Sequence, residues 1–196
     1  MKSTSWLALF LVALLLPAAA TAKHVRPDSG LADATVMIIR HAEKPESGAG
    51  LAPEGVARAQ AYVGYFEHFT LDGEPMVPNA LYATADSPSS MRPRLTITPL
   101  SRALGLPIDD RFTDKQTREL AESLRTDPHG DHVLIAWHHG ELPKLVRDLG
   151  GDPTTLIPGG KWPSQVFGWV VVLRYDHRGR LVSSQLIHEH RMPDDR

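Results

Sequence analysis

The sequence predicts an α/β fold, a three-layer α/β/α sandwich whose sheet is mostly parallel with an antiparallel edge. Two patterns indicate this class. Apolar runs of strand length alternate along the chain with longer segments of helical periodicity. The last two apolar runs are separated by a turn sequence typical of a hairpin. With 196 residues, 42% apolar and 22% charged, the chain suits one folded domain.

Residues 1–22 have the layout of a secretory signal peptide. Lys2 precedes an apolar run over residues 6–16, and Pro17 and small residues follow as far as Ala22. A membrane-spanning helix needs roughly 20 apolar residues, and this run is shorter. We therefore expect cleavage near Ala22, export to the periplasm or the medium, and no stable membrane anchor. Residues 23–196 are then expected to form a single domain.

Composition excludes several classes of protein. The chain has no cysteine, which excludes disulfides, thiolate metal sites and a lipid-modified cysteine. Without the leader, 20 Lys and Arg stand against 23 Asp and Glu, a formal charge of −3. This balance, without basic runs, argues against a nucleic-acid-binding protein.

The first half of the domain predicts strand, helix, strand and helix in turn. Ala34 to Ile39 is an apolar run with β-branched residues, as in a strand buried on both faces. Pro53 to about Phe69 has apolar residues at helical spacing. A second strand is expected over residues 79–84 and a second helix over 92–104, in which Pro99 predicts a kink or a break.

The second half predicts another strand and helix, a third core strand with its helix, and the terminal hairpin. Thr113 or Asp114 is expected to cap the first of these helices. Gly150 and Gly151 end the second helix, and a long Pro/Gly loop follows. In chain order, the expected ranges are strand 107–112, a helix running to about 125, strand 132–137, helix 141–149, and hairpin strands 168–175 and 181–188.

The main chemical motif stands where the first strand ends. Arg40-His41-Ala42-Glu43 follows the strand directly, and Leu51-Ala52-Pro53-Glu54-Gly55 begins the next helix. Parallel α/β sheets bind ligands beyond the carboxyl ends of their strands, so these residues are well placed for chemistry. Together, the two motifs resemble the opening of the histidine phosphatase superfamily, which also contains the cofactor-dependent phosphoglycerate mutases.

A second match follows the second strand. The segment over residues 87–96 resembles the family segment in which an arginine lies four residues before a threonine. Arg92 fits this spacing to Thr96 and is preferred over its neighbour Arg94.

A third match follows the third core strand. With it, the resemblance covers roughly residues 34–190. His139-Gly140 is similar to the second histidine of the family. His138 competes for this role, and His139 is preferred because Gly140 follows it directly. The resemblance implies the histidine phosphatase (phosphoglycerate mutase-like) fold.

The resemblance also implies a mechanism that needs no metal and no cofactor. His41 would attack phosphorus through an unprotonated ring nitrogen, and water would hydrolyse the phosphohistidine. Arg40 and Arg92 would hold the phosphoryl oxygens, with His139 as a further donor. The expected activity is hydrolysis of a small-molecule or protein phosphomonoester.

The proton donor and the substrate stay open at this level. Glu43, Asp114 and Glu141 are all candidates for the group that protonates the leaving alcohol. Leaving-group recognition is expected in the loops, chiefly 70–78, 106–118 and 151–167, whose composition identifies no ligand. The oligomeric state is equally undetermined.

Three alternatives accompany the phosphatase prediction. A phosphomutase of the same superfamily is disfavoured by the expected export and by the short chain. A non-catalytic module would keep the pocket and only bind phosphate or another anion. A histidine-based metal protein would require four side chains to converge: His138, His139, His188 and His190.

Overall fold

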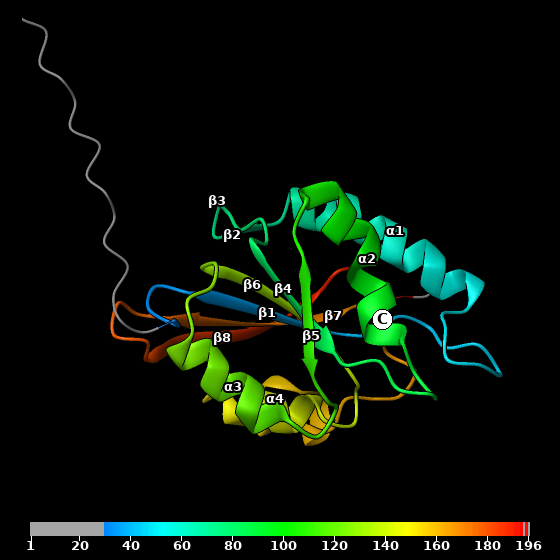
Figure 1. The fold of residues 1–196 in the computed structure, drawn as a ribbon. Coiled ribbons are helices and arrows are strands. Elements are labelled where there is room, and N and C mark those ends of the chain that lie inside the picture. Colours follow the sequence, from blue (N-terminus) through cyan, green and yellow to red (C-terminus); the bar gives the residue numbers. More distant parts are fainter. Residues whose placement is uncertain (1–29, 194, 196) are drawn as a thin grey trace, which may run out of the picture.

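The computed structural model describes residues 30–193 and 195, and these form the predicted three-layer architecture (Figure 1). The central sheet has the strand order β5-β4-β6-β1-β7-β8. The pairs β4/β5, β4/β6 and β1/β6 are parallel, whereas β7 runs antiparallel to both β1 and β8. The mostly parallel sheet with an antiparallel edge is therefore confirmed. Its strands are β1 (Thr35–Arg40), β4 (Ala80–Thr84), β5 (Ile108–Phe112), β6 (His132–Trp137), β7 (Trp169–Tyr175) and β8 (Leu181–His188).

Helices cover both faces of the sheet, because its central strands β1, β6 and β7 are buried on both sides. On one face, Met37 and Ile39 of β1 share a buried cluster with residues of α1 (Pro53–Glu67) and α2 (Arg92–Leu104). Val36 and Ile38 point to the other face, which α3 (Thr117–Thr126) and α4 (Leu142–Asp148) cover. Figure 1 shows these helix pairs as the two outer layers.

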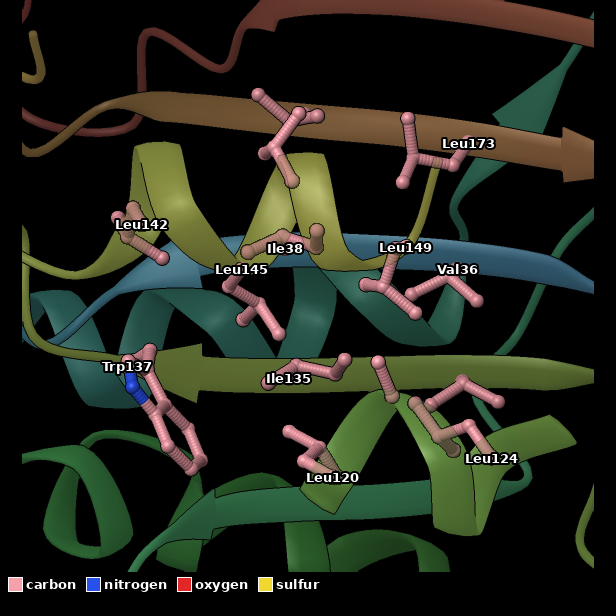
Figure 2. Packing of buried hydrophobic residues seen from close by; sticks show 14 of the residues in the cluster. Val36, Ile38, Leu120, Leu124, Ile135, Trp137, Leu142, Leu145, Leu149 and Leu173 are labelled. Carbon is pink, nitrogen blue, oxygen red and sulfur yellow. The ribbon is translucent and has the colours of Figure 1, made fainter. Parts of the chain in front are cut away.

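The second face carries the larger apolar cluster. Figure 2 shows Leu120 of α3 and Leu145 of α4 directed toward the strands, beside Trp137 at the end of β6. All three side chains are fully buried. Burial of this size stabilises the strand ends that hold the charged residues described below.

Four parts of the chain differ from the sequence expectations. Pro99 does not break α2, because Ile97 and Leu100 on either side of it are fully buried in the core. Neither Thr113 nor Asp114 caps α3, since Gln116 is its N-cap residue. The small hairpin of β2 (Thr70–Leu71) and β3 (Glu74–Pro75), and α5 (Pro153–Leu156) with a 3₁₀ turn (Pro158–Gly160), were not expected.

The predicted signal peptide over residues 1–22 lies outside the described residues. Within the described part of the chain, no helix has the length and apolarity needed to cross a bilayer.

Candidate active site

The four predicted site residues meet in one cavity of about 650 Å³ beyond the ends of β1 and β6. We call it the reaction pocket. Arg40 and His41 come from the end of β1, Arg92 from the start of α2, and His139 from the turn after β6. Because β1 and β6 are parallel neighbours in register, with Arg40 opposite Trp137, their carboxyl ends bring these residues together.

His41 is held as a neutral imidazole. Its Nδ1 lies 2.6 Å from the carbonyl oxygen of Ala42, and only a protonated Nδ1 can donate to a carbonyl. Nε2 therefore carries the lone pair. Burial lowers the pKa of His41 to about 3, and the nearby charges of Arg40 and Arg92 act in the same direction. At neutral pH this ring is therefore unprotonated, with the Nε2 lone pair free.

Arg40 is fixed by its surroundings on one side only. Its Nη1 donates to the carbonyl oxygens of residues 163, 164 and 166, the nearest contact being 2.7 Å to Ser164. The guanidinium lies 3.8 Å from the ring centroid of Phe167. Burial lowers its pKa to about 10, so the group stays charged at neutral pH, and its buried Nε has no partner.

Arg92, and not its competitor Arg94, lines the reaction pocket. Its Nη1 makes only long contacts of 3.3–3.4 Å with backbone carbonyls, and its buried Nε has no partner. Arg94 instead forms an ion pair with Asp86. The hydroxyl of Thr96 connects the loop after His41 to the start of α2. It donates a hydrogen bond to the Arg92 carbonyl and accepts one from the Ala42 amide, each at 2.8 Å.

The structure brings both histidines of the β6–α4 turn to the reaction pocket. The His138 ring centroid lies 5.1 Å from that of His41, and the His139 centroid lies 6.5 Å away. Burial lowers the pKa of His138 to about 4 and also lowers that of His139. The Nδ1 of His139 is buried without a partner. Both rings therefore have the chemistry of neutral hydrogen-bonding groups at the pocket.

The three carboxyl candidates for proton donor are in different environments. Glu43 accepts two hydrogen bonds from Arg58, at 2.8 and 2.9 Å, and Glu141 forms an ion pair with Lys115. Asp114 has a buried Oδ1 without a partner. Its pKa is raised, first by burial and then by the charge of Glu141.

Asp114 lines the pocket, and hydrogen bonds fix the turn before α3 in which it lies. The Trp137 indole donates to the Asp114 carbonyl at 3.0 Å, and the Gln116 side chain accepts from the Thr113 amide at 2.9 Å. These bonds explain why this segment forms a turn instead of the expected first turn of a helix.

The sequence analysis did not identify two residues that contact the site, Phe167 beside Arg40 and Arg58 beside Glu43. Phe167 stands in a loop without periodicity, so no pattern could single it out. Arg58 falls on the buried face of α1, beside Ala59 and one turn before Tyr62, and a charged residue at such a position signals a buried ion pair. Gly55 on the same helix packs against the loop after His41, where a Cβ would lie 2.5 Å from the Glu43 carbonyl oxygen.

Unpaired buried polar atoms concentrate at the reaction pocket. Seven buried side-chain nitrogen or oxygen atoms lack a hydrogen-bond partner in the described part of the chain, and five of them belong to residues lining this pocket. Folded proteins rarely leave such atoms unpaired, so their clustering indicates a site for a polar ligand. The five atoms are Arg40 Nε, Arg92 Nε, His139 Nδ1, Asp114 Oδ1 and Glu43 Oε2.

The four histidines of the metal-protein alternative do not form a metal site in the described residues. Among residues 30–193 and 195, no three His, Cys, Asp or Glu side chains are grouped so that they could hold a metal ion. His188 and His190 contact each other, with ring centroids 5.9 Å apart, while His138 and His139 lie at the reaction pocket.

Comparison with known proteins gives similarity in structure only. No protein-family model matches the sequence, and no curated protein matches it. A protein described as the phosphohistidine phosphatase SixA from Agrobacterium tumefaciens matches with a TM-score of 0.51 and 18% identity, over 78% of this chain and 97% of its own.

Two other solved structures give similar values. A protein histidine phosphatase SixA complexed with tungstate has a TM-score of 0.51 and 15% identity, over 77% of this chain and 96% of its own. A phosphoglycerate mutase from Plasmodium falciparum has a TM-score of 0.51 and 16% identity, over 83% and 95%. The chain therefore has the fold of the histidine phosphatases and phosphoglycerate mutases, as the sequence resemblance implied.

Proposed function

We propose that this chain is a histidine phosphatase that hydrolyses phosphomonoesters through a phosphohistidine intermediate on His41. The observation that supports this most is the ring of unpaired polar atoms around a neutral imidazole. The Nε–H groups of Arg40 and Arg92 are charged donors without acceptors, and a phosphoryl group supplies such acceptors. Phosphoryl transfer needs little more than such positioned charge and an in-line nucleophile.

The first step forms the intermediate. Nε2 of His41 attacks phosphorus, an N–P bond forms, and the P–O bond to the alcohol breaks. Arg40 and Arg92 bind the phosphoryl oxygens, and their positive charge stabilises the charge that accumulates on them in the transition state. His138 lies closer to His41 than His139 does, so we assign it the inner hydrogen bond to the phosphoryl group and give His139 the outer one.

Asp114 is the proposed proton donor in this step. Its raised pKa favours the protonated acid that the leaving oxygen requires, and it has no competing partner for Oδ1. In the second step the Asp114 carboxylate takes a proton from water, and the oxygen of that water attacks phosphorus. The N–P bond then breaks, releasing phosphate and restoring His41. Ester and water give alcohol and phosphate in balance.

The substrate is a small-molecule or protein phosphomonoester, and export is part of the proposal. The signal-like leader of residues 1–22 supports a location in the periplasm or the medium. Cell fractionation of the full chain tests this directly: we expect a product that begins near Lys23 outside the cytoplasm, and an uncleaved product retained inside would contradict it.

The central test compares the protein with His41→Ala on p-nitrophenyl phosphate in the presence of a metal chelator. We expect turnover that survives chelation and is abolished in the variant. Quench of the active protein in alkaline detergent should trap one phosphate on His41, because phosphohistidine is stable in base and hydrolyses in acid. Phosphate binding without turnover would instead identify a binding module. Transfer of phosphate to a second alcohol in place of water would identify a mutase.

A further inference from the structure

A second cavity of about 570 Å³ adjoins the reaction pocket. We call it the acidic cavity. The two share Glu43, Glu54 and Phe167 as lining residues, so a molecule bound at His41 can extend from one into the other. The residues that define the acidic cavity chemically are Glu43, Glu54, Arg58, Phe167, Met192 and Asp195.

The one arginine lining this cavity cannot bind an anion. Arg58 is 3% exposed, and its five N–H groups make five hydrogen bonds to three carboxylates at 2.6–3.0 Å. A guanidinium has only five N–H donors, so none is left for a ligand. The acidic cavity is therefore not a second phosphate site, although it contains an arginine.

The ionised groups that remain available in the acidic cavity are acceptors. Glu43 uses Oε1 for Arg58, while its buried Oε2 has no partner. Glu54 is exposed in the first turn of α1. Three carboxylates and one guanidinium line the cavity, a formal charge of −2, and Gln165 contributes only a neutral amide. Such a lining favours a positively charged ligand and repels a negatively charged one.

The rest of the wall is apolar and suits a small organic group. Val166, Phe167, Met192 and Pro193 contribute it. One face of the Phe167 ring is occupied by the Arg40 guanidinium at 3.8 Å. A cation in this cavity is thus bound by the carboxylates rather than by stacking on this aromatic ring.

We infer that the acidic cavity binds the alcohol part of the substrate and that this alcohol carries a protonated amine. The inference rests on the proposed function, because it places the phosphate of the same molecule at His41. The ammonium group donates to Glu43 Oε2 and to Glu54 across the shared wall. The substrate class is then the phosphomonoester of an amino alcohol or an amino sugar. Alcohols with a further phosphate or carboxylate are excluded by the lining charge.

Two matched pairs of substrates test the inference at two lengths. Each pair exchanges an amine for a hydroxyl: O-phosphoethanolamine against 2-hydroxyethyl phosphate, and glucosamine 6-phosphate against glucose 6-phosphate. We expect the amine to raise kcat/KM at pH 7 at least about tenfold in one pair, the effect of placing one charge beside an opposite one near a protein surface. Equal kcat/KM within both pairs would overturn the inference.

Two variants connect the preference to the cavity. Glu54→Gln should reduce the amine-to-hydroxyl ratio of kcat/KM about fivefold, because one carboxylate near the ammonium is lost. Glu46→Gln removes an exposed carboxylate that lines neither cavity and should leave the ratio unchanged. If both variants change the ratio equally, the preference does not come from the acidic cavity and the inference is wrong.

Failure of the proposed function gives a different result. If p-nitrophenyl phosphate and all four esters remain uncleaved, the phosphatase proposal falls, and the inference with it. If p-nitrophenyl phosphate is cleaved but neither amine is preferred, the phosphatase proposal stands and only the amine inference is refuted.

Discussion

Replacing Arg58 by methionine removes a buried cation and leaves the three carboxylates around it without a counter-charge. The side chain is 3% exposed, and it joins Glu43, two residues after His41, to Glu189 after β8 and to Asp195. Burial lowers the pKa of the guanidinium, but its hydrogen bonds to Asp195 and Glu43 outweigh this, so the pKa is raised. Methionine keeps the apolar stem, so the variant tests the charge more than the volume.

The expected loss is large for one substitution. Removal of one partner of a buried ion pair costs ~3–5 kcal/mol, and five hydrogen bonds to three carboxylates place Arg58→Met at the upper end. With an m-value of ~2 kcal/mol/M, the urea midpoint should fall by about 2 M. Urea unfolding followed by circular dichroism measures this at pH 8.

Arg111→Met is the matched control. Arg111 is 56% exposed, and it pairs with Asp109 and Asp127 at the surface. Exposed pairs contribute ~0–1 kcal/mol, so its midpoint should change little. The two variants should therefore differ clearly.

Protonation offers a second check on the same variant. Burial raises the pKa of Glu189 to about 7, so at pH 5.5 a proton can neutralise part of the excess charge. The destabilisation by Arg58→Met should then be smaller at pH 5.5 than at pH 8. An Arg58→Met loss no greater than that of Arg111→Met, or a loss that grows at lower pH, would refute the reasoning.

Three further results are expected. His138→Ala should lower kcat on p-nitrophenyl phosphate by about 10²-fold and His139→Ala by less, because His138 lies nearer to His41; steady-state kinetics decide, and the reverse order would contradict the assignment. Asp114→Asn should lower kcat by about 10²-fold or more on glycerol 2-phosphate, whose leaving group needs a proton, but far less on p-nitrophenyl phosphate. Equal losses on the two esters would exclude Asp114 as the acid. Folding holds the pKa of His41 at about 3, below its unfolded value of about 6.5. Between these values the unfolded chain binds the extra proton, so the contribution of His41 is present above pH 6.5 and is lost as pH falls. In urea unfolding at pH 7 and pH 4.5, the wild type should lose about 2.5 kcal/mol more than His41→Gln; equal losses would show that His41 is not buried in its neutral form.

Regular elements were predictable where the sequence pattern repeats often enough to define a period. The strand over residues 132–137 and the helix over 92–104 have the expected ends, because a long apolar run and a proline in the first turn mark them. The hairpin of β2 and β3 and the four-residue helix α5 are too short to establish any period. The start of α3 was wrong for a different reason, since the bond from the Trp137 indole comes from a strand that is distant in sequence.

The fold class and the side chains that stand at strand ends could both be predicted from the sequence alone. Arg40, His41, Arg92 and His139 each stand where an apolar strand stops or a helix begins. Parallel pairing of β6 with both β1 and β4 then brings these strand ends to one edge of the sheet. The distances between these side chains follow from tertiary packing and could not be predicted from the sequence. The ring distances separate His138 from His139 as neighbours of His41.

The environments of the three candidate carboxyl groups could likewise be distinguished only in the folded structure. Glu43, Asp114 and Glu141 have similar chemistry in isolation, and their differences come from partners far along the chain. Arg58 and Lys115 pair with two of them, whereas the buried Oδ1 of Asp114 has no partner and its pKa is raised. Burial and pairing are properties of the folded neighbourhood, because they depend on side chains that only tertiary packing brings within hydrogen-bond distance.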